Sequence, residues 1–143
     1  MKKILFICHG NICRSVSAEY IMKYLVKEKG YTDYVISSAA TSREEIGNDI
    51  YPPAKRKLKE KKIPFSRHYA RQVTQSDYLE YDYLIGMDDY NISNLTRKFH
   101  QDPEHKIYKL LDRDVSDPWY SGDFETAYQD IYEGCLQWLK KLG

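Results

Sequence analysis

Short apolar runs alternate with amphipathic helical patterns along the chain, and this alternation constrains the fold more than any other feature. Four strands are predicted, at residues 4–8, 34–38, 83–87 and 106–111, and the apolar run at 4–8 predicts that the first of them is buried. Helical patterns predict helices at residues 15–29, from 52 to about 62, and at 124–139. A further helix is predicted to follow the third strand and to end at about residue 99. Strands that alternate with helices build a parallel sheet that is covered on both faces. The sequence therefore predicts a three-layer α/β/α fold around a four-stranded parallel sheet.

Length and charge narrow the class of protein. A chain of 143 residues fits one domain, residues 1–143, with a substantial core. It has 22 Lys and Arg against 21 Asp and Glu, a balance too even to predict a nucleic-acid partner. The apolar run at residues 4–8 is too short for a secretory signal or a membrane span, so we expect a cytoplasmic protein with no membrane partner. Its three cysteines then indicate chemistry or core packing, because disulfide frameworks are rare in a reducing compartment.

The segment that joins the first predicted strand to the first predicted helix, residues 8–15, reads Cys-His-Gly-Asn-Ile-Cys-Arg-Ser. In open parallel sheets, ligands bind beyond the carboxyl ends of the strands, where this segment lies. A loop that enters a helix directs successive backbone N–H groups at one point, and the helix dipole adds positive potential there. Gly10 and Asn11 are residue types that tolerate the left-handed backbone angles of a tight loop. The segment is therefore predicted to bind an anion.

Cys8 and Arg14 give this loop a chemical function. N–H groups that bind an anion also stabilise a thiolate, which makes Cys8 a candidate nucleophile. Arg14 can hold two phosphate oxygens with its planar guanidinium. We expect in-line attack of sulfur on phosphorus, catalysed by positioning and charge stabilisation. Arg14 and the backbone amides supply the positive charge, and no His or Cys cluster has metal-ligand spacing, so neither a metal nor another cofactor is expected.

Residues 8–15 resemble the signature of the low-molecular-weight protein tyrosine phosphatases. Further motifs follow in that family's order, at residues 37–42, 68–72, 81–83, 87–88 and 117–120, so the resemblance covers essentially the whole chain. It implies a four-stranded parallel sheet with the phosphatase loop between the first strand and the first helix. It also implies metal-independent hydrolysis of phosphotyrosine-containing proteins and small aryl phosphates. The resemblance implies that this reaction passes through a cysteinyl-phosphate intermediate and releases inorganic phosphate.

Asp117 is the candidate general acid. A departing tyrosine oxygen needs a proton, and Pro118 stiffens the loop that carries this carboxyl group. The local sequence alone fits a turn-forming Asp-Pro pair equally well. The resemblance assigns Asp117 the acid role and, in the second step, the role of base toward water.

The resemblance also assigns binding and supporting residues. Those predicted to hold the phosphate are His9, Gly10, Asn11, Ile12, Cys13, Arg14 and Ser15. Those predicted to brace the loop through hydrogen bonds are Asn11, Ser15, Ser38 and His68. Ser15 is further expected to donate to the sulfur and to improve it as a leaving group.

The other two cysteines have different expected roles. Cys13 matches a family residue that can form a reversible disulfide with Cys8 and so protect it from further oxidation. Cys135 lies on the apolar stripe of the last predicted helix and is expected in the core.

The rim of the pocket is where the sequence departs from the family pattern. The predicted rim residues are Glu44, Tyr51, Trp119 and Tyr120. Glu44 occupies a position where some relatives have an aromatic wall. His9 replaces an apolar residue of many relatives and is expected at the pocket mouth, where its protonated form would help to bind a dianionic phosphate. Some relatives self-associate through rim aromatics, which predicts a weak homodimer.

Three other functions are alternatives to phosphotyrosine hydrolysis. Relatives that dephosphorylate arginine have Thr in place of Ile12 and lack an aromatic pair like Trp119 and Tyr120. A phosphotyrosine-binding module without turnover would need neither Cys8 nor Asp117. Arsenate reductases of this fold need additional cysteines in the middle of the chain, and residues 76–99 contain none. The sequence therefore favours phosphotyrosine hydrolysis, with an arginine phosphatase and a non-catalytic binding module as the alternatives.

Overall fold

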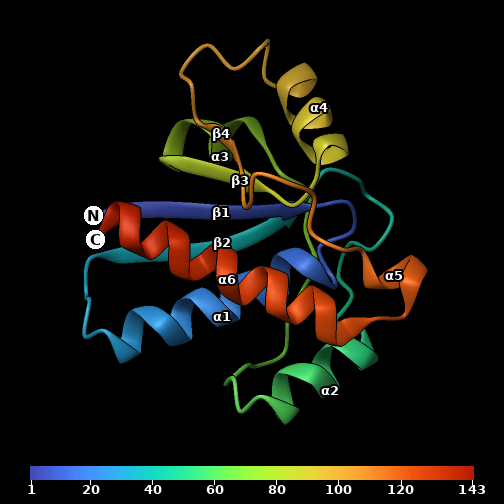
Figure 1. Ribbon diagram of the computed structural model, residues 1–143. Coiled ribbons are helices and arrows are strands. Elements are labelled where there is room, and N and C mark those ends of the chain that lie inside the picture. Colours follow the sequence, from blue (N-terminus) through green and yellow to red (C-terminus); the bar gives the residue numbers. More distant parts are fainter.

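The computed structural model describes residues 1–143, and a four-stranded parallel sheet with the order β2-β1-β3-β4 lies at its centre (Figure 1). The strands are β1 (Lys2–Cys8), β2 (Tyr34–Ala40), β3 (Tyr83–Gly86) and β4 (Ile107–Lys109). The predicted fold class is thus confirmed, but the last two strands are shorter than the sequence suggests. Met87 leaves the ladder because its N–H donates to Asn91 Oδ1. Leu110 and Leu111 are apolar because they pack in the core beyond the end of β4.

Six helices surround the sheet. They are α1 (Arg14–Glu28), α2 (Pro52–Glu60), α3 (Gln75–Glu80), α4 (Asp89–Lys98), α5 (Pro118–Ser121) and α6 (Phe124–Leu142). α1 and α6 pack against one face of the sheet with α2 beside them, whereas α3 and α4 cover the other face (Figure 1). Thr74 and Asp77 form a capping box at the start of α3. The short α5, which follows Asp117, is an element that sequence patterns did not indicate.

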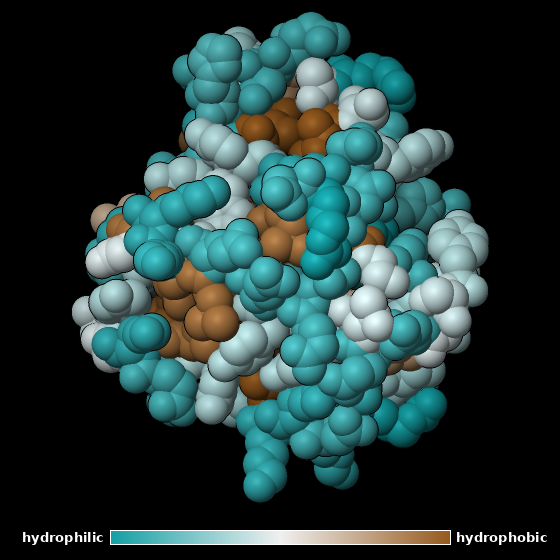
Figure 2. All heavy atoms as spheres, in the orientation of Figure 1, coloured by the Kyte–Doolittle hydropathy of each residue, from teal (hydrophilic) through white to brown (hydrophobic).

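The central strand β1 divides its side chains between two cores. Ile4 and Phe6 pack with the α1 and α6 side, and Leu5 and Ile7 pack with the α3 and α4 side. This alternation follows from the two-residue period of a strand, and it explains why the run is apolar throughout. The outer surface in the view of Figure 2 is mostly hydrophilic, with separate apolar patches between polar side chains. No helix combines the length and the apolar character that a membrane crossing requires.

The strand order places a binding crevice at the end of β1. From β1 the chain passes first to β2 on one side and later to β3 on the other, so its direction across the sheet reverses beside β1. Ligands bind at such switch points, outside the carboxyl ends of the strands. Cys8 ends β1 at this edge, and Asp88 comes two residues after β3 ends.

Gly134 offers a test of the packing between α6 and the sheet. A Cβ atom at this position would lie 2.5 Å from Leu110 Cγ, which is closer than any normal contact. We expect Gly134→Ala to lower the free energy of unfolding by about 1–2 kcal/mol, because overpacking outweighs the helix propensity gained on replacing Gly. Urea unfolding measures this change. Gln137→Ala, an exposed change on the same helix, is the control and should stay within about 0.5 kcal/mol of wild type. An unchanged or more stable Gly134→Ala protein would contradict the packing described.

Candidate active site

The loop between β1 and α1 combines a buried sulfur with an open helix N-terminus. Cys8 is 4% exposed, and the N–H of Asn11 donates to its Sγ over 3.3 Å. Cys13, which precedes α1, makes no side-chain cap, and the first helical turn carries no acidic residue. The first N–H groups of a helix have no partner within the helix, and no side chain occupies these. The loop can therefore hold both an anionic sulfur and an anionic ligand.

Asn11 is the centre of the network that braces this loop. Its φ of +61° is the left-handed conformation expected from the sequence. Its Nδ2 donates to Ser15 Oγ and to Ser38 Oγ, each over 2.9 Å. Ser38 in turn donates to Glu19 Oε1 over 2.6 Å. All four of these side chains are buried, so the network holds the loop from inside the protein.

His68 completes the predicted network from the loop before α3. Its Nε2 lies 2.7 Å from the carbonyl oxygen of Asn11, so Nε2 carries the proton and donates. Burial lowers the pKa of His68 below its ordinary value, although the hydrogen bond to Asn11 acts in the opposite direction. The imidazole is therefore neutral at pH 7. Asn11, Ser15, Ser38 and His68 are thus brought together as the sequence predicts.

The network also directs a hydroxyl group at the sulfur. Ser15 Oγ lies 3.0 Å from Cys8 Sγ. Because Ser15 already accepts from Asn11 Nδ2, its own hydrogen is free to point at the sulfur. This geometry lets Ser15 donate to Cys8 when the sulfur carries negative charge.

Gly10 differs from the expectation, because it is not among the residues with positive φ. Its missing side chain serves a different purpose. A Cβ at Gly10 would lie 3.3 Å from Cγ of Glu45, whose side chain packs over the loop. Glycine here allows the close approach of Glu45 to the loop between β1 and α1.

Arg14 is held by three oxygen groups from the other side of the crevice. Its side chain is 4% exposed, and Nη1 donates to the Val115 carbonyl over 3.1 Å. Nη2 lies 2.9 Å from Asp88 Oδ2 and 3.3 Å from Asp117 Oδ2. Burial by itself would lower the pKa of this guanidinium, but the negative charges around it, that of Cys8 first, raise it above its ordinary value. Arg14 is thus a fixed cation beside the sulfur.

Sequence reasoning missed Asp88 and Glu19 as site residues. Asp88 belongs to a motif that matches the family, and it lies just beyond β3 at the switch point, which is the signal that could have found it. Glu19 lies four residues after Ser15 on the same face of α1. A charged residue on the buried face of a helix is unusual, and this feature of Glu19 could have indicated a site residue.

Asp117 reaches the crevice from the start of α5. Its Oδ1 accepts a hydrogen bond from the Trp119 N–H over 3.1 Å, which caps the short helix. Its Oδ2 is the atom near Arg14. The side chain is partly exposed, so it can meet both a ligand in the crevice and water. Asp117 thus caps a turn, as the Asp-Pro sequence suggests, and it also reaches the crevice.

A cavity of about 300 Å³ opens above the loop. It is lined by Cys8, His9, Gly10, Ile12, Cys13, Arg14, Glu44, Glu45, Asp117, Trp119 and Tyr120. The predicted nucleophile, phosphate clamp and acid therefore share one cavity. Glu45 also lines the cavity, although the sequence did not predict it as a site residue. It directly follows the predicted rim residue Glu44.

The structure places Glu44, Trp119 and Tyr120 of the predicted rim in the cavity wall. Trp119 and Tyr120 line the cavity and are 54% and 85% exposed. Tyr51 does not line it, because its ring packs against Trp119 with centroids 4.8 Å apart and so supports that wall from behind. His9 is at the mouth as expected, where its Nε2 lies 2.9 Å from Glu44 Oε2.

All three cysteines are free thiols in different surroundings. Burial, followed by the charge of Cys8, raises the pKa of the half-buried Cys13 thiol well above its ordinary value. Cys13 therefore stays a protonated thiol within the loop, and its expected redox role remains a prediction. Cys135 is fully buried on α6 and belongs to the core, as the sequence indicated.

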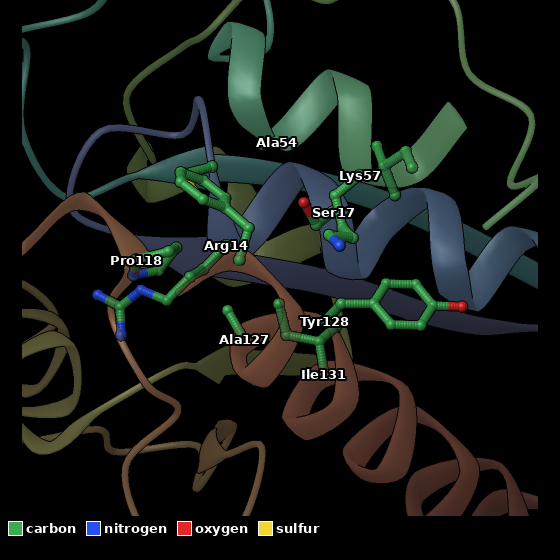
Figure 3. Close-up of a pocket in the computed structure, with 11 residues that line it drawn as sticks. Arg14, Ser17, Ala54, Lys57, Pro118, Ala127, Tyr128 and Ile131 are labelled. Carbon is green, nitrogen blue, oxygen red and sulfur yellow. The ribbon is translucent and has the colours of Figure 1, made fainter. Parts of the chain in front are cut away.

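A second, much smaller cavity of about 20 Å³ lies between α1, α2 and α6 (Figure 3). The stem of Arg14 borders this cavity, but the guanidinium extends away from it past Pro118 (Figure 3). The space is a gap in helix packing with room for no more than about one water molecule. The guanidinium of Arg14 thus belongs to the lining of the larger cavity.

Comparisons with known proteins agree with this geometry. The family model described as low molecular weight phosphotyrosine protein phosphatase matches residues 3–143. The human low molecular weight phosphotyrosine protein phosphatase is 37% identical over 157 residues, which cover 98% of this chain and 95% of the human protein. The crystal structure of a low molecular weight protein tyrosine phosphatase from Streptococcus pyogenes matches with a TM-score of 0.94 and 40% identity, covering 100% of this chain and 94% of that one.

A Drosophila arginine phosphatase also has this fold, with a TM-score of 0.90, 28% identity and coverage of 99% of this chain and 97% of that one. Its similarity is lower than that of the tyrosine phosphatases above. From the family model, the identity over the whole chain and the common fold, we conclude that this protein belongs to the low molecular weight phosphotyrosine protein phosphatase family.

Proposed function

We propose that this protein hydrolyses phosphotyrosine in protein substrates with Cys8 as nucleophile, Arg14 as phosphate clamp and Asp117 as general acid. The observation that carries the proposal is the meeting of these three side chains in one cavity at an uncapped helix N-terminus. In the first step the Cys8 thiolate attacks phosphorus, an S–P bond forms, and the bond from phosphorus to the tyrosine oxygen breaks. The loop N–H groups and Arg14 hold the phosphoryl oxygens, and Asp117 gives its proton to the departing oxygen.

The second step hydrolyses the cysteinyl phosphate. Asp117, now a carboxylate, takes a proton from a water molecule that attacks phosphorus. The S–P bond breaks, inorganic phosphate leaves, and Cys8 returns to a thiolate. The hydroxyl of Ser15, 3.0 Å from the sulfur, stabilises the negative charge that returns to it. Arg14 and the amides supply the positive charge in both steps, so the mechanism requires no metal.

The aromatic wall supports tyrosine as the dephosphorylated residue. Ile12 and Trp119 line the cavity and offer apolar contact to a phenol ring. Turnover of one peptide sequence that carries either phosphotyrosine or phosphoarginine tests this substrate. We expect faster turnover of the phosphotyrosine peptide, and a preference for phosphoarginine would overturn the proposal.

A thiolate enzyme works best where thiols stay reduced, which supports a location in the cytoplasm.

Asp117→Asn tests the acid role through its dependence on the leaving group. We expect this change to slow phenyl phosphate by about 10²-fold, because the phenolate formed from it needs a proton. p-Nitrophenyl phosphate should lose less than about tenfold, because its leaving group is stable as an anion. Steady-state kcat for both esters gives the comparison. Equal slowing of the two substrates would remove Asp117 from the acid role.

A further inference from the structure

The wall of the active-site cavity carries more negative than positive groups. Arg14 is its only Lys or Arg residue, whereas the carboxylates of Glu44, Glu45 and Asp117 all line the cavity. Arg14 is moreover paired with Asp88 and Asp117. A phosphate dianion that enters this cavity therefore meets little surplus positive charge outside the backbone amides.

Glu44 and Glu45 lie at the lip of the cavity rather than at its floor. The side chain of Glu44 is 70% exposed, and that of Glu45 packs with its Cγ over Gly10. Their loop is fastened to the phosphate-binding loop, because Ser42 donates to the His9 carbonyl from both its hydroxyl and its backbone N–H. The two carboxylates thus have defined places above the phosphate site.

No other charged group of the cavity wall cancels these carboxylates. Apart from Arg14, the basic residue of the cavity wall is His9, and its Nε2 lies 2.9 Å from the carboxylate of Glu44. Trp119 and Tyr120, which also line the cavity, are uncharged. The lip therefore presents a net negative surface to whatever lies next to the phosphorylated residue.

We propose that Glu44 and Glu45 select phosphotyrosine sites that have a Lys or Arg residue beside the phosphotyrosine. The phosphate reaches the floor of the cavity, and the neighbouring residues of the substrate stay at the lip. A basic neighbour is attracted to the two carboxylates and offsets the charge of the phosphate, whereas an acidic neighbour is repelled. This inference rests on the proposed function and adds the class of substrate to it.

Three peptides test the selection. They share one sequence around phosphotyrosine and differ in having Lys, Ala or Glu on both sides of it. Because an exposed charge pair changes an equilibrium by up to about fivefold, we expect kcat/KM for the Lys peptide to exceed that for the Glu peptide by about tenfold at low salt. The ratio should fall toward about two at 0.5 M NaCl, where such charges are screened.

Variants of the lip show whether these two residues cause the preference. Glu44→Gln combined with Glu45→Gln should reduce the Lys-to-Glu ratio to less than about threefold, and Glu45→Lys should lower it by a similar factor. Glu28→Gln combined with Glu104→Gln removes the same charge from exposed positions outside the cavity, and it should keep the wild-type ratio.

The outcomes separate this inference from the proposed function. Turnover of all three peptides at equal rates by wild type, or an unchanged ratio in the Glu44 and Glu45 double variant, would overturn the selection and leave the phosphatase assignment intact. Absence of turnover on every peptide would overturn the proposed function and the selection with it.

Discussion

Replacing Cys8 with Ser is expected to reduce kcat by at least about 10⁴-fold, because the hydroxyl is a far weaker nucleophile than the thiolate it replaces. The sulfur sits at the floor of the cavity with an N–H and a hydroxyl directed at it, and both groups stabilise an anion there. Binding of inorganic phosphate should persist in this variant, since the loop N–H groups and Arg14 are unchanged. Single-turnover kinetics and phosphate titration by calorimetry measure the two quantities.

Cys135→Ala is the matched control for this change. Cys135 is fully buried on α6, away from the cavity lining, so its loss should affect stability more than turnover. Residual activity of Cys8→Ser within about 100-fold of wild type would show that another group attacks the phosphorus.

Replacing Arg14 with Lys is expected to lower kcat/KM by about 10³-fold even though the charge is kept. The guanidinium is oriented by the Val115 carbonyl and by the carboxylates of Asp88 and Asp117. A Lys ammonium cannot satisfy these partners and also hold two phosphoryl oxygens in one plane. Initial rates on p-nitrophenyl phosphate give the ratio, and the loss should appear in kcat as well as in KM.

Arg113→Lys serves as the comparison for an arginine outside the cavity. Arg113 forms an ion pair with Asp130 at 2.9 Å, and its side chain is half-exposed. Its replacement should leave kcat/KM within about twofold of wild type, as surface ion pairs contribute little. If Arg14→Lys came equally close to wild type, bidentate clamping would not be the role of this residue.

The fold was predictable because its central strands β1 and β3 are buried on both faces. Such strands appear as continuous apolar runs, and the helices between them show regular apolar spacing. The limits of β3 and β4 were not predictable in the same way. Met87 and Leu110 are as apolar as strand residues, but the Met87 N–H bonds to the side chain of Asn91, and Leu110 lies just beyond β4, where its N–H still donates to the Gly86 carbonyl. The short α5 depends on the cap from Asp117, and four residues give no periodic signal.

The centre of the site was predictable from one continuous segment, since Cys8 and Arg14 lie at the two ends of a single loop. The parts supplied by distant segments were harder to predict. Asp88 meets Arg14 only because β3 lies beside β1, and Glu19 meets Ser38 only because α1 packs on β2. Sequence spacing carries no information on such contacts. Tyr51 shows the reverse case, an aromatic residue near the site that supports Trp119 instead of lining the cavity.

The most direct test of the account is chemical identification of the phosphorylated intermediate. Rapid mixing with a phosphotyrosine peptide, acid quenching and peptide mapping by mass spectrometry would locate the transferred phosphoryl group. The account predicts one phosphoryl group on Cys8, formed before free phosphate is released and absent from the Cys8→Ser protein. A phosphoryl group on any other residue, or turnover through no covalent intermediate at all, would contradict it.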